Sequence, residues 1–268
     1  MSGSATITAA IITLDEEQAL DGLLAELDWV DQIVVVDGGS RDQTVRIART
    51  HGCRVVERPM DTFARQRNCA LQLAGSEWVL SIDADERPAP GLAAEVRRRI
   101  ARGRHAAYRI PIRSTIFGRP LRRSGTQDDC PVRLARRSGA CWVGDVHEVL
   151  RVAGPVGRLR SRLDHRPLPD LDRFLAKMNR YTALEARSRL AAGRRPRRAQ
   201  RWIAPGREVF RRMFWRQGFL DGPAGWAFCL LSGLSEWVLA ARCRQLWEAA
   251  AAERTAATAQ LARIDPLP

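Results

Sequence analysis

Runs of β-branched and aliphatic residues alternate with amphipathic stretches along the first third of the chain. Ala5–Thr13, Ile33–Val36 and Trp78–Ile82 have the pattern of buried strands, and Arg54–Val56 is predicted to be a further short strand. Between them, leucines at i, i+3, i+4 and i+7 from Leu20 to Leu27 predict a helix, as does the stretch Phe63–Ala74. This alternation predicts an α/β protein with a mostly parallel, doubly wound sheet and helices on both faces.

Polar residues follow three of these strands, at the point where each strand ends. They are Thr13–Asp15, Asp37 and Asp83–Asp85. Because the carboxyl ends of parallel strands meet at one edge of the sheet, we expect these residues to converge in one crevice. There Asp37 can accept a hydrogen bond from a base N–H, and Arg67 on the third helix can neutralise phosphate or brace the base.

The acids after the fourth strand have the pattern of a metal site. In a tight turn Asp83 and Asp85 can face one point, where their oxygens and a substrate's phosphates would hold Mg²⁺ or Mn²⁺ at about 2.1 Å. Solvated acids in a loop can have the same Asp-x-Asp spacing. The prediction of a metal site therefore depends on the polar residues at the neighbouring strand ends. Neither a GxGxxG dinucleotide loop nor a GxxxxGK[ST] phosphate loop is present. The crevice is therefore predicted to bind a nucleotide diphosphate, with Asp83 near the ribose and the metal, and Asp85 on the metal.

Four segments carry a resemblance to a known family. They read IITLDEE, VVVDGGSRDQT, FARQRNCAL and WVLSIDADE, and they lie in order between residues 5 and 90. They resemble the nucleotide-binding half of family-2 glycosyltransferases with the GT-A fold. The resemblance implies a nucleotide-diphospho-sugar donor, a divalent metal and inversion at the anomeric carbon. It matches Thr13, Asp15, Asp37 and Arg67 to donor-contacting positions, whereas Leu14 stands where many members have an aromatic residue.

The pattern of motifs and helices along the rest of the chain predicts how it is divided. We expect a catalytic domain over residues 1–166, with a donor half (1–90) and an acceptor half (91–166), followed by a helical extension over 167–268. The predicted elements of the acceptor half are a helix from Pro90 to Ala101, strands Ala107–Ile112 and Pro131–Leu134, and a hairpin Ser114–Arg123 that turns at Gly118–Pro120.

An inverting transfer needs one general base that removes a proton from the acceptor hydroxyl. We favour Glu148, because VHE lies where GT-A enzymes carry their base and follows a Trp-Val-Gly segment that can desolvate it. Asp128 or Asp129 is the next candidate, and Asp145 comes after them. Alternatively, Glu148 only pairs with one of the many arginines.

Two further observations concern the metal and the compartment. The resemblance places a late metal-ligating histidine at about His165, although a solvated or capping role is the commoner one for a single histidine. The six cysteines form no CxxC pair, which suits a reducing cytosol. The N-terminus shows no basic segment followed by an apolar core, so we expect no signal peptide.

The net charge is +14, and Lys177 is the only lysine. Such a balance favours anionic partners, although a biased composition rich in Arg and Ala explains part of it. Helical stripes follow Pro167, and the stretch Gly193–Arg201 is very basic. Residues 224–241 are mostly apolar but carry Glu236, which disfavours a full membrane span. We expect a peripheral contact with an anionic membrane surface; a helical cap on the catalytic domain is the alternative.

Late motifs narrow the resemblance to one branch. VHEVL, FLAKMNRYT and GFLDGPAGW resemble the lipopolysaccharide-core β-1,4-glucosyltransferases. This branch implies a cytoplasmic-facing enzyme that moves a sugar, UDP-hexose first, to a lipid-linked or core saccharide. The alternatives are a sugar nucleotidyltransferase, which would carry a Gly-rich basic loop where Thr13–Glu17 is acidic, and an Arg-rich nucleic-acid-binding protein.

Overall fold

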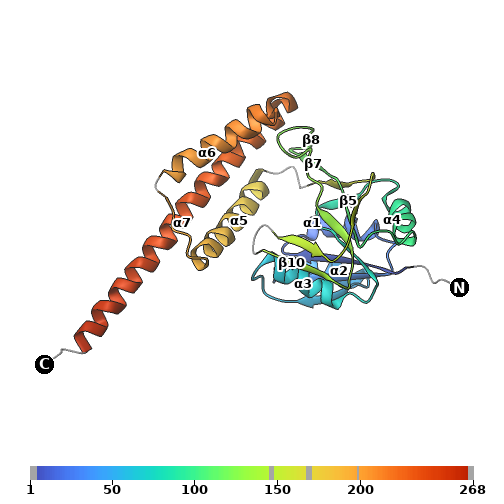
Figure 1. Ribbon diagram of the computed structural model, residues 1–268, viewed down its shortest axis with the longest axis horizontal. Coiled ribbons are helices and arrows are strands. Elements are labelled where there is room, and N and C mark those ends of the chain that lie inside the picture. Colours follow the sequence, from blue (N-terminus) through green and yellow to red (C-terminus); the bar gives the residue numbers. More distant parts are fainter. Residues whose placement is uncertain (1–4, 145–147, 167–170, 198, 265–268) are drawn as a thin grey trace. The chain divides into compact units, whose positions relative to one another are not determined.

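The computed structural model describes residues 5–144, 148–166, 171–197 and 199–264. The contacts divide the chain into two compact units, Met1–Asp170 and Leu171–Pro268. The first unit contains the sheets and the second is helical (Figure 1). We predicted a boundary after residue 166; the contacts divide the chain after Asp170.

The first unit is organised around a seven-stranded sheet. Its strands, in spatial order, are β12 (Val156–Arg158), β6 (Ala107–Arg109), β9 (Val132–Arg136), β4 (Trp78–Ser81), β1 (Ile7–Thr13), β2 (Gln32–Asp37) and β3 (Arg54–Glu57). β1 pairs in parallel with β2 and β4, and β2 with β3, whereas β9 runs antiparallel to both of its neighbours. The predicted α/β class, with a mostly parallel sheet that is mixed on the acceptor side, is confirmed.

Alternating side chains of the strands form a core on each face of the sheet. Ile7 and Ile11 of β1 pack with α1 (Glu17–Ala25), α2 (Thr44–Thr50) and α4 (Leu92–Ala101). The other face joins Ala10, Val34 and Val36 to α3 (Phe63–Leu73), whereas Val35 of β2 belongs to the first cluster. Helices therefore cover both faces, and the carboxyl ends of β1, β2 and β4 stay accessible at one edge.

The acceptor half differs from its prediction at two places. The predicted strand Ala107–Ile112 is two strands, because Pro111 has no N–H to donate and β7 (Ile112–Ile116) enters a second sheet. In the predicted hairpin, Arg119 and Pro120 form β8 and pair with Ile116 and Thr115. The turn is therefore at residues 117–118, where Phe117 and Gly118 have φ of 49° and 73°.

Two smaller sheets carry chemistry-bearing residues toward the edge of the main sheet. In the four-stranded sheet, β13 (Leu163–His165) lies between β5 (Glu86–Pro88) and β7, with His165 opposite Glu86. In the two-stranded sheet, β10 (Ala140–Val143) pairs with β11 (Val149–Val152). β13 thus brings His165 beside the residues that follow β4.

The second unit is helical, as its amphipathic stripes predicted. It contains α5 (Leu171–Ala191), α6 (Gln200–Phe210), a π-helical turn (Arg211–Trp215), a 3-10 turn (Gly218–Asp221) and α7 (Gly222–Ile264). Ala186, Leu239 and Cys243 form a small core between α5 and α7. By length and composition alone, the segment Gly218–Thr255 qualifies as a membrane-spanning helix, which the apolar run 224–241 by itself did not.

Candidate active site

Asp37 is the buried acid at the end of β2, and its carboxylate organises the turn that follows. One oxygen accepts hydrogen bonds from the hydroxyls of Thr13 (2.9 Å) and Ser40 (2.5 Å). The other accepts from the N–H groups of Gly39 (2.9 Å) and Ser40 (2.8 Å). Gly38 keeps the chain close to β1, since a Cβ there would lie 3.2 Å from the Thr13 carbonyl oxygen. The predicted convergence of Thr13 and Asp37 is therefore a direct contact.

Asp15 shapes the loop that follows β1. Its φ of 56° is left-handed, a region that short polar side chains tolerate. Its carboxylate accepts a hydrogen bond from the Arg41 N–H at 2.8 Å, and its own N–H donates to the Ser40 hydroxyl at 2.8 Å. The loops after β1 and β2 thus form one hydrogen-bonded rim.

Arg67, on α3, is buried and bonds three groups from different parts of the chain. Its Nη2 donates to Asp83 at 2.7 Å, its Nη1 to the Ser81 hydroxyl at 2.9 Å and its Nε to Glu148 at 2.9 Å. The guanidinium lies 4.9 Å from the centre of the Trp142 ring. Burial works against its charge, but Asp83 and Glu148 raise the pKa of Arg67, so the group stays cationic.

A second buried guanidinium holds the other side of Asp83. Arg133 of β9 donates at 2.9 Å to both Asp83 and Glu86, and Glu86 accepts from the Asp83 N–H at 2.9 Å. Burial opposes the charge of Asp83, but Arg133 and Arg67 hold the pKa of that carboxyl well below its usual range. Burial raises the pKa of Glu86 to about 7 although Arg133 opposes this. Asp83 is thus a permanent anion between two guanidinium groups.

Asp85 lies beside His165. Its side chain is 10% exposed, and its Oδ2 is 3.1 Å from His165 Nε2. The register of β13 with β5 and the bond from the Arg166 N–H to the Asp85 carbonyl (2.8 Å) fix this approach. Asp129 is nearby: desolvation raises its pKa, against the charges of Arg133 and His165.

The Asp85–His165 pair fits two ligands of one ion. A carboxylate oxygen and a ring nitrogen are both donors that divalent ions accept in proteins, and Asp85 Oδ2 and His165 Nε2 lie 3.1 Å apart. Among the described residues, no group of three or more His, Cys, Asp or Glu side chains is arranged to hold a metal. The remaining ligands would therefore be phosphate oxygens and water. Both Asp83 oxygens accept from arginines, so its place among the ligands remains a prediction.

The candidates for the general base lie at different places. Glu148 precedes β11 and is 14% exposed; its ion pair with Arg67 is the alternative that the sequence left open. Asp128 and Asp129 precede β9 and both residues are exposed, although the protein around the Asp129 carboxyl group is enough for desolvation to raise its pKa. Asp145 and His147 lie outside the described residues. All of these roles remain predictions.

Sequence reasoning did not single out Arg133 and assigned no role to Glu86; it gave Trp142 a part only in desolvating Glu148, not the contact with Arg67. Arg133 had a detectable signal, since it is a charge inside the otherwise apolar predicted strand Pro131–Leu134. Glu86 was noted as an acid, but its contact with Arg133 depends on the pairing of β9 with β4. Sequence spacing does not show that pairing.

An open α/β sheet with an acid- and arginine-lined carboxyl edge defines a class of nucleotide-binding enzymes. Comparison with protein families narrows the class: the model named "Glycosyl transferase family 2" matches residues 8–149. The chain belongs to this family, and the protein is a glycosyltransferase. The resemblance found in the sequence is confirmed, and a sugar nucleotidyltransferase or a nucleic-acid-binding protein is disfavoured.

One relative and two solved structures resemble this chain at less than 30% identity. The chain is 29% identical over 243 residues to the lipopolysaccharide core biosynthesis glycosyltransferase LpsC of Rhizobium meliloti (strain 1021), covering 84% of this chain and 90% of that protein. Among solved structures, S. aureus TarS 1–349 is 14% identical, with 67% of this chain and 65% of that chain covered and a TM-score of 0.46. Glucosyl-3-phosphoglycerate synthase from Mycobacterium tuberculosis, solved with Mn²⁺, UDP and glucosyl-3-phosphoglycerate, is 18% identical, with coverages of 67% and 78% and a TM-score of 0.42.

Proposed function

We propose that the protein is an inverting, metal-dependent glycosyltransferase. It moves a sugar from a nucleotide-diphospho-sugar, UDP-hexose first, to a lipid-linked or core saccharide of the bacterial envelope. The observation that carries this proposal is the network around Arg67 and Asp83, which joins α3, the end of β4 and Glu148 at the carboxyl edge of the sheet. Membership of family 2 and the similarity to LpsC support the reaction class and the acceptor class.

Each part of the edge has a role in this proposal. The rim of Thr13, Asp15 and Asp37 receives the nucleoside. The Asp37 carboxylate already accepts four hydrogen bonds, so a base N–H would bond to the same oxygen as the Ser40 hydroxyl. Asp83, anchored by two guanidiniums, faces the ribose. Asp85 and His165 would hold Mn²⁺ or Mg²⁺, which when bound neutralises charge on the departing diphosphate.

Glu148 is the proposed general base. Its Oε1 accepts from Arg67, which orients the carboxylate, and Oε2 accepts no hydrogen bond from the described residues. Oε2 would take the proton of the acceptor hydroxyl while the sugar's anomeric carbon is attacked from the face opposite the diphosphate. Asp129 is the second candidate, on account of its position near Arg133 and His165.

Donor binding by calorimetry tests the proposal first. UDP, GDP and dTDP are titrated with and without Mn²⁺ into the wild type, Asp85→Ala and the control Glu57→Gln, an exposed acid of β3. One nucleotide should bind tightly, and only when Mn²⁺ is present. Its affinity should fall at least roughly tenfold in Asp85→Ala, because that variant loses a charged metal ligand. The control should bind it as tightly as the wild type. Mn²⁺-dependent binding that survives Asp85→Ala would remove Asp85 from the metal site, and no binding at all would refute the donor site.

We also propose peripheral attachment to the inner face of the cell membrane. The second unit exposes an aromatic belt that runs from α6 to the start of α7, consisting of Trp202, Ile203, Phe210, Phe214, Trp215, Leu220, Trp226 and Leu230. Trp215 is 80% exposed. Aromatic and aliphatic faces flanked by arginines such as Arg207 and Arg216 are suited to the headgroup layer, where anionic lipid attracts them.

Vesicle sedimentation tests the attachment. Wild type should bind phosphatidylcholine vesicles that contain phosphatidylglycerol, and the double variant Trp202→Ser, Trp215→Ser should bind them several-fold more weakly because it loses apolar area. The control changes two exposed valines of the first unit, Val149→Ser and Val156→Ser. Equal binding by both double variants would exclude the belt as the contact.

A further inference from the structure

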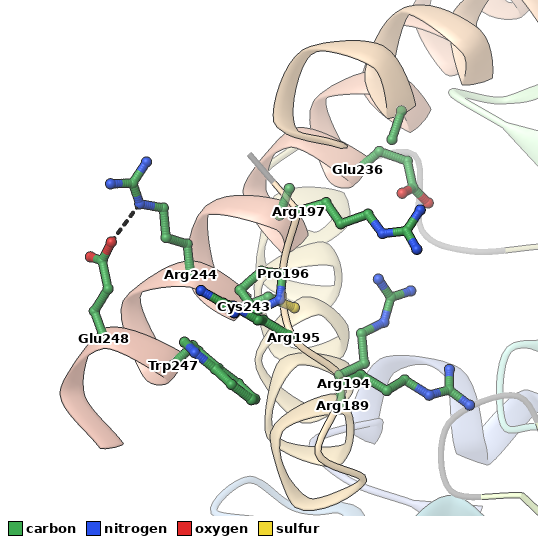
Figure 2. Close-up of a pocket in the computed structure, with 12 residues that line it drawn as sticks. Arg189, Arg194, Arg195, Pro196, Arg197, Glu236, Cys243, Arg244, Trp247 and Glu248 are labelled. Carbon is green, nitrogen blue, oxygen red and sulfur yellow. Dashed lines mark hydrogen bonds and ion pairs between the residues drawn. The ribbon is translucent and has the colours of Figure 1, made fainter. Parts of the chain in front are cut away.

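A pocket of about 500 Å³ lies within the helical unit and takes no part in the reaction proposed above. The end of α5, the following loop, α6 and α7 form its walls (Figure 2). Its charged lining residues are Arg189, Arg194, Arg195, Arg197, Arg244, Glu236 and Glu248. Positive charge therefore exceeds negative charge by three in one concave space.

One acid of the pocket, Glu236, lies beside a loop arginine, Arg197, in Figure 2. Within the described part of the chain, no ion pair or side-chain hydrogen bond involves Arg194, Arg195 or Arg197. The other two arginines do have partners: Arg189 donates to Glu185 at 2.7 Å and Arg244 to Glu248 at 2.7 Å. In Figure 2, Arg189, Arg194 and Arg197 point to one side of the loop and Arg195 to the other, whereas Arg244 points away toward Glu248. The cluster thus presents unpaired N–H donors to the pocket.

The other lining residues make the pocket a defined site. Trp247 gives it an aromatic wall, and Cys243, 8% exposed, lies in the small core that joins α5 to α7. Gly193, with φ of 66°, ends α5 and turns the chain into the loop, where the Arg194 N–H donates to the Arg189 carbonyl at 2.9 Å. Arg194, Arg195 and Arg197 therefore lie on one short loop, where they are exposed and open to an anion.

We propose that this pocket binds a phosphate-bearing group, a phosphomonoester or a diphosphate. A guanidinium group can donate two parallel hydrogen bonds to phosphate oxygens. Several guanidinium groups around one pocket therefore suit a ligand with two or more negative charges. The pocket is also larger than a single phosphate requires and has an aromatic wall, which suits a phosphate attached to a larger molecule. That molecule is a lipid with an anionic headgroup or a soluble phosphorylated compound. This proposal does not depend on the reaction of the first unit.

Two binding measurements on the full chain separate these sources. Inorganic pyrophosphate is titrated by calorimetry, and vesicles of phosphatidylcholine with and without phosphatidic acid are tested by sedimentation. The test variant is Arg194→Gln, Arg195→Gln, Arg197→Gln. The control, Arg98→Gln, Arg102→Gln, Arg104→Gln, removes the same charge from exposed positions on and after α4. A second test variant, Ala204→Glu, adds a carboxylate to the pocket wall with a single change.

Pyrophosphate binding that falls at least roughly tenfold in both test variants, and not in the control, supports a soluble phosphorylated ligand. The same pattern seen only with phosphatidic acid vesicles supports a lipid headgroup. The triple change Arg194→Lys, Arg195→Lys, Arg197→Lys should also weaken binding, because it keeps charge and loses the fork. Binding that is absent in both measurements, or that falls equally in test and control variants, overturns the proposal.

UDP binding by the first unit is a separate control and should be unchanged in every variant. A loss of phosphate binding without a loss of UDP binding would therefore concern this pocket and not the donor site.

Discussion

At the scale of single residues, the edge of the sheet depends on two buried arginines that share one acid. Arg67 and Arg133 each donate to a different oxygen of Asp83, and each also bonds a glutamate. An arginine fork reaches several partners in a fixed plane, which a lysine ammonium does not do. The planar guanidinium, and not only its charge, therefore sets the geometry of Asp83 and Glu148.

Arg67→Lys tests this distinction. The variant keeps the charge but should lose the contacts with Ser81 and Glu148. We expect the free energy of unfolding to fall by about 2 kcal/mol and the affinity for UDP with Mn²⁺ to fall about tenfold. Urea unfolding and calorimetry measure the two effects. The control is Arg65→Lys on the exposed face of α3, whose side chain is 71% exposed; a similar effect of both changes would contradict the argument.

At the scale of elements, a few close contacts fix the positions of helices relative to neighbouring segments. The Glu95 side chain of α4 accepts hydrogen bonds from the Arg160 N–H (3.1 Å) and the Ser161 N–H (2.8 Å), which joins α4 to the segment before β13. In the second unit, a Cβ on Gly233 of α7 would lie 2.4 Å from Val209 Cγ2 of α6. In both cases a helix is held in place by a contact with another segment, in addition to its own backbone hydrogen bonds.

The Glu95 contact predicts a pH dependence of stability. Burial favours the neutral acid, but the Ser161 and Arg160 N–H groups lower the pKa of Glu95 below its usual range. Its stabilising effect is therefore fully present above the unfolded pKa of about 4.3 and is lost as the pH falls through the folded pKa. Glu95→Gln should lower the free energy of unfolding by about 1–2 kcal/mol at neutral pH.

That difference should shrink as the pH falls below the folded pKa, in urea unfolding measured across the pH range. Glu26→Gln, at an exposed position just after α1, is the control and should have little effect at any pH. A Glu95→Gln effect that is the same at every pH would show that the charge of Glu95 does not contribute.

The helix contact predicts a clash. Gly233→Ala should lower stability by about 1–3 kcal/mol, because the methyl group forces α6 and α7 apart. Val209→Ala in the same chain should restore part of the loss. Gly206→Ala is the matched control, since nothing lies within 4 Å of its added Cβ, and it should be neutral or stabilising. Thermal unfolding measures all four proteins; a neutral Gly233→Ala would contradict the close packing.

At the scale of the whole molecule, each unit has a core of its own. The sheet of the first unit has apolar clusters on both faces, and the helices of the second meet around Ala186, Leu239 and Cys243. The first unit carries the acids and arginines of the candidate active site, and the second carries the aromatic belt and the arginine pocket. The proposed donor site and the proposed surface attachment thus belong to different units.

A chain that ends after Asp170 tests this separation. It should unfold cooperatively and bind UDP with Mn²⁺ within about threefold of the full chain, because the donor contacts come from residues before that point. It should not sediment with anionic vesicles. Circular dichroism, calorimetry and sedimentation check the three statements. Vesicle binding equal to that of the full chain would place the membrane contact in the first unit.

The sequence by itself determined the class of the fold and the candidates for the site. Apolar runs and helical patterns are local, so the strands up to β4 and the helices α1, α3 and α4 were found within a few residues. Topology then required Thr13, Asp37 and Asp83 to share one edge; the bond between Thr13 and Asp37 confirms this for the first two, and the pairing of β4 with β1 places Asp83 at the end of the neighbouring strand.

Only the tertiary structure decided which atoms meet. The pairing of β9 with β4 brought Arg133 to Asp83 and Glu86, and β13 brought His165 to Asp85. These contacts join residues about 50 to 80 positions apart, and no local periodicity encodes such pairings. The arginine pocket was equally hidden: the basic run near Gly193 was visible, but its meeting with Arg244 and Trp247 depends on the packing of α5 on α7.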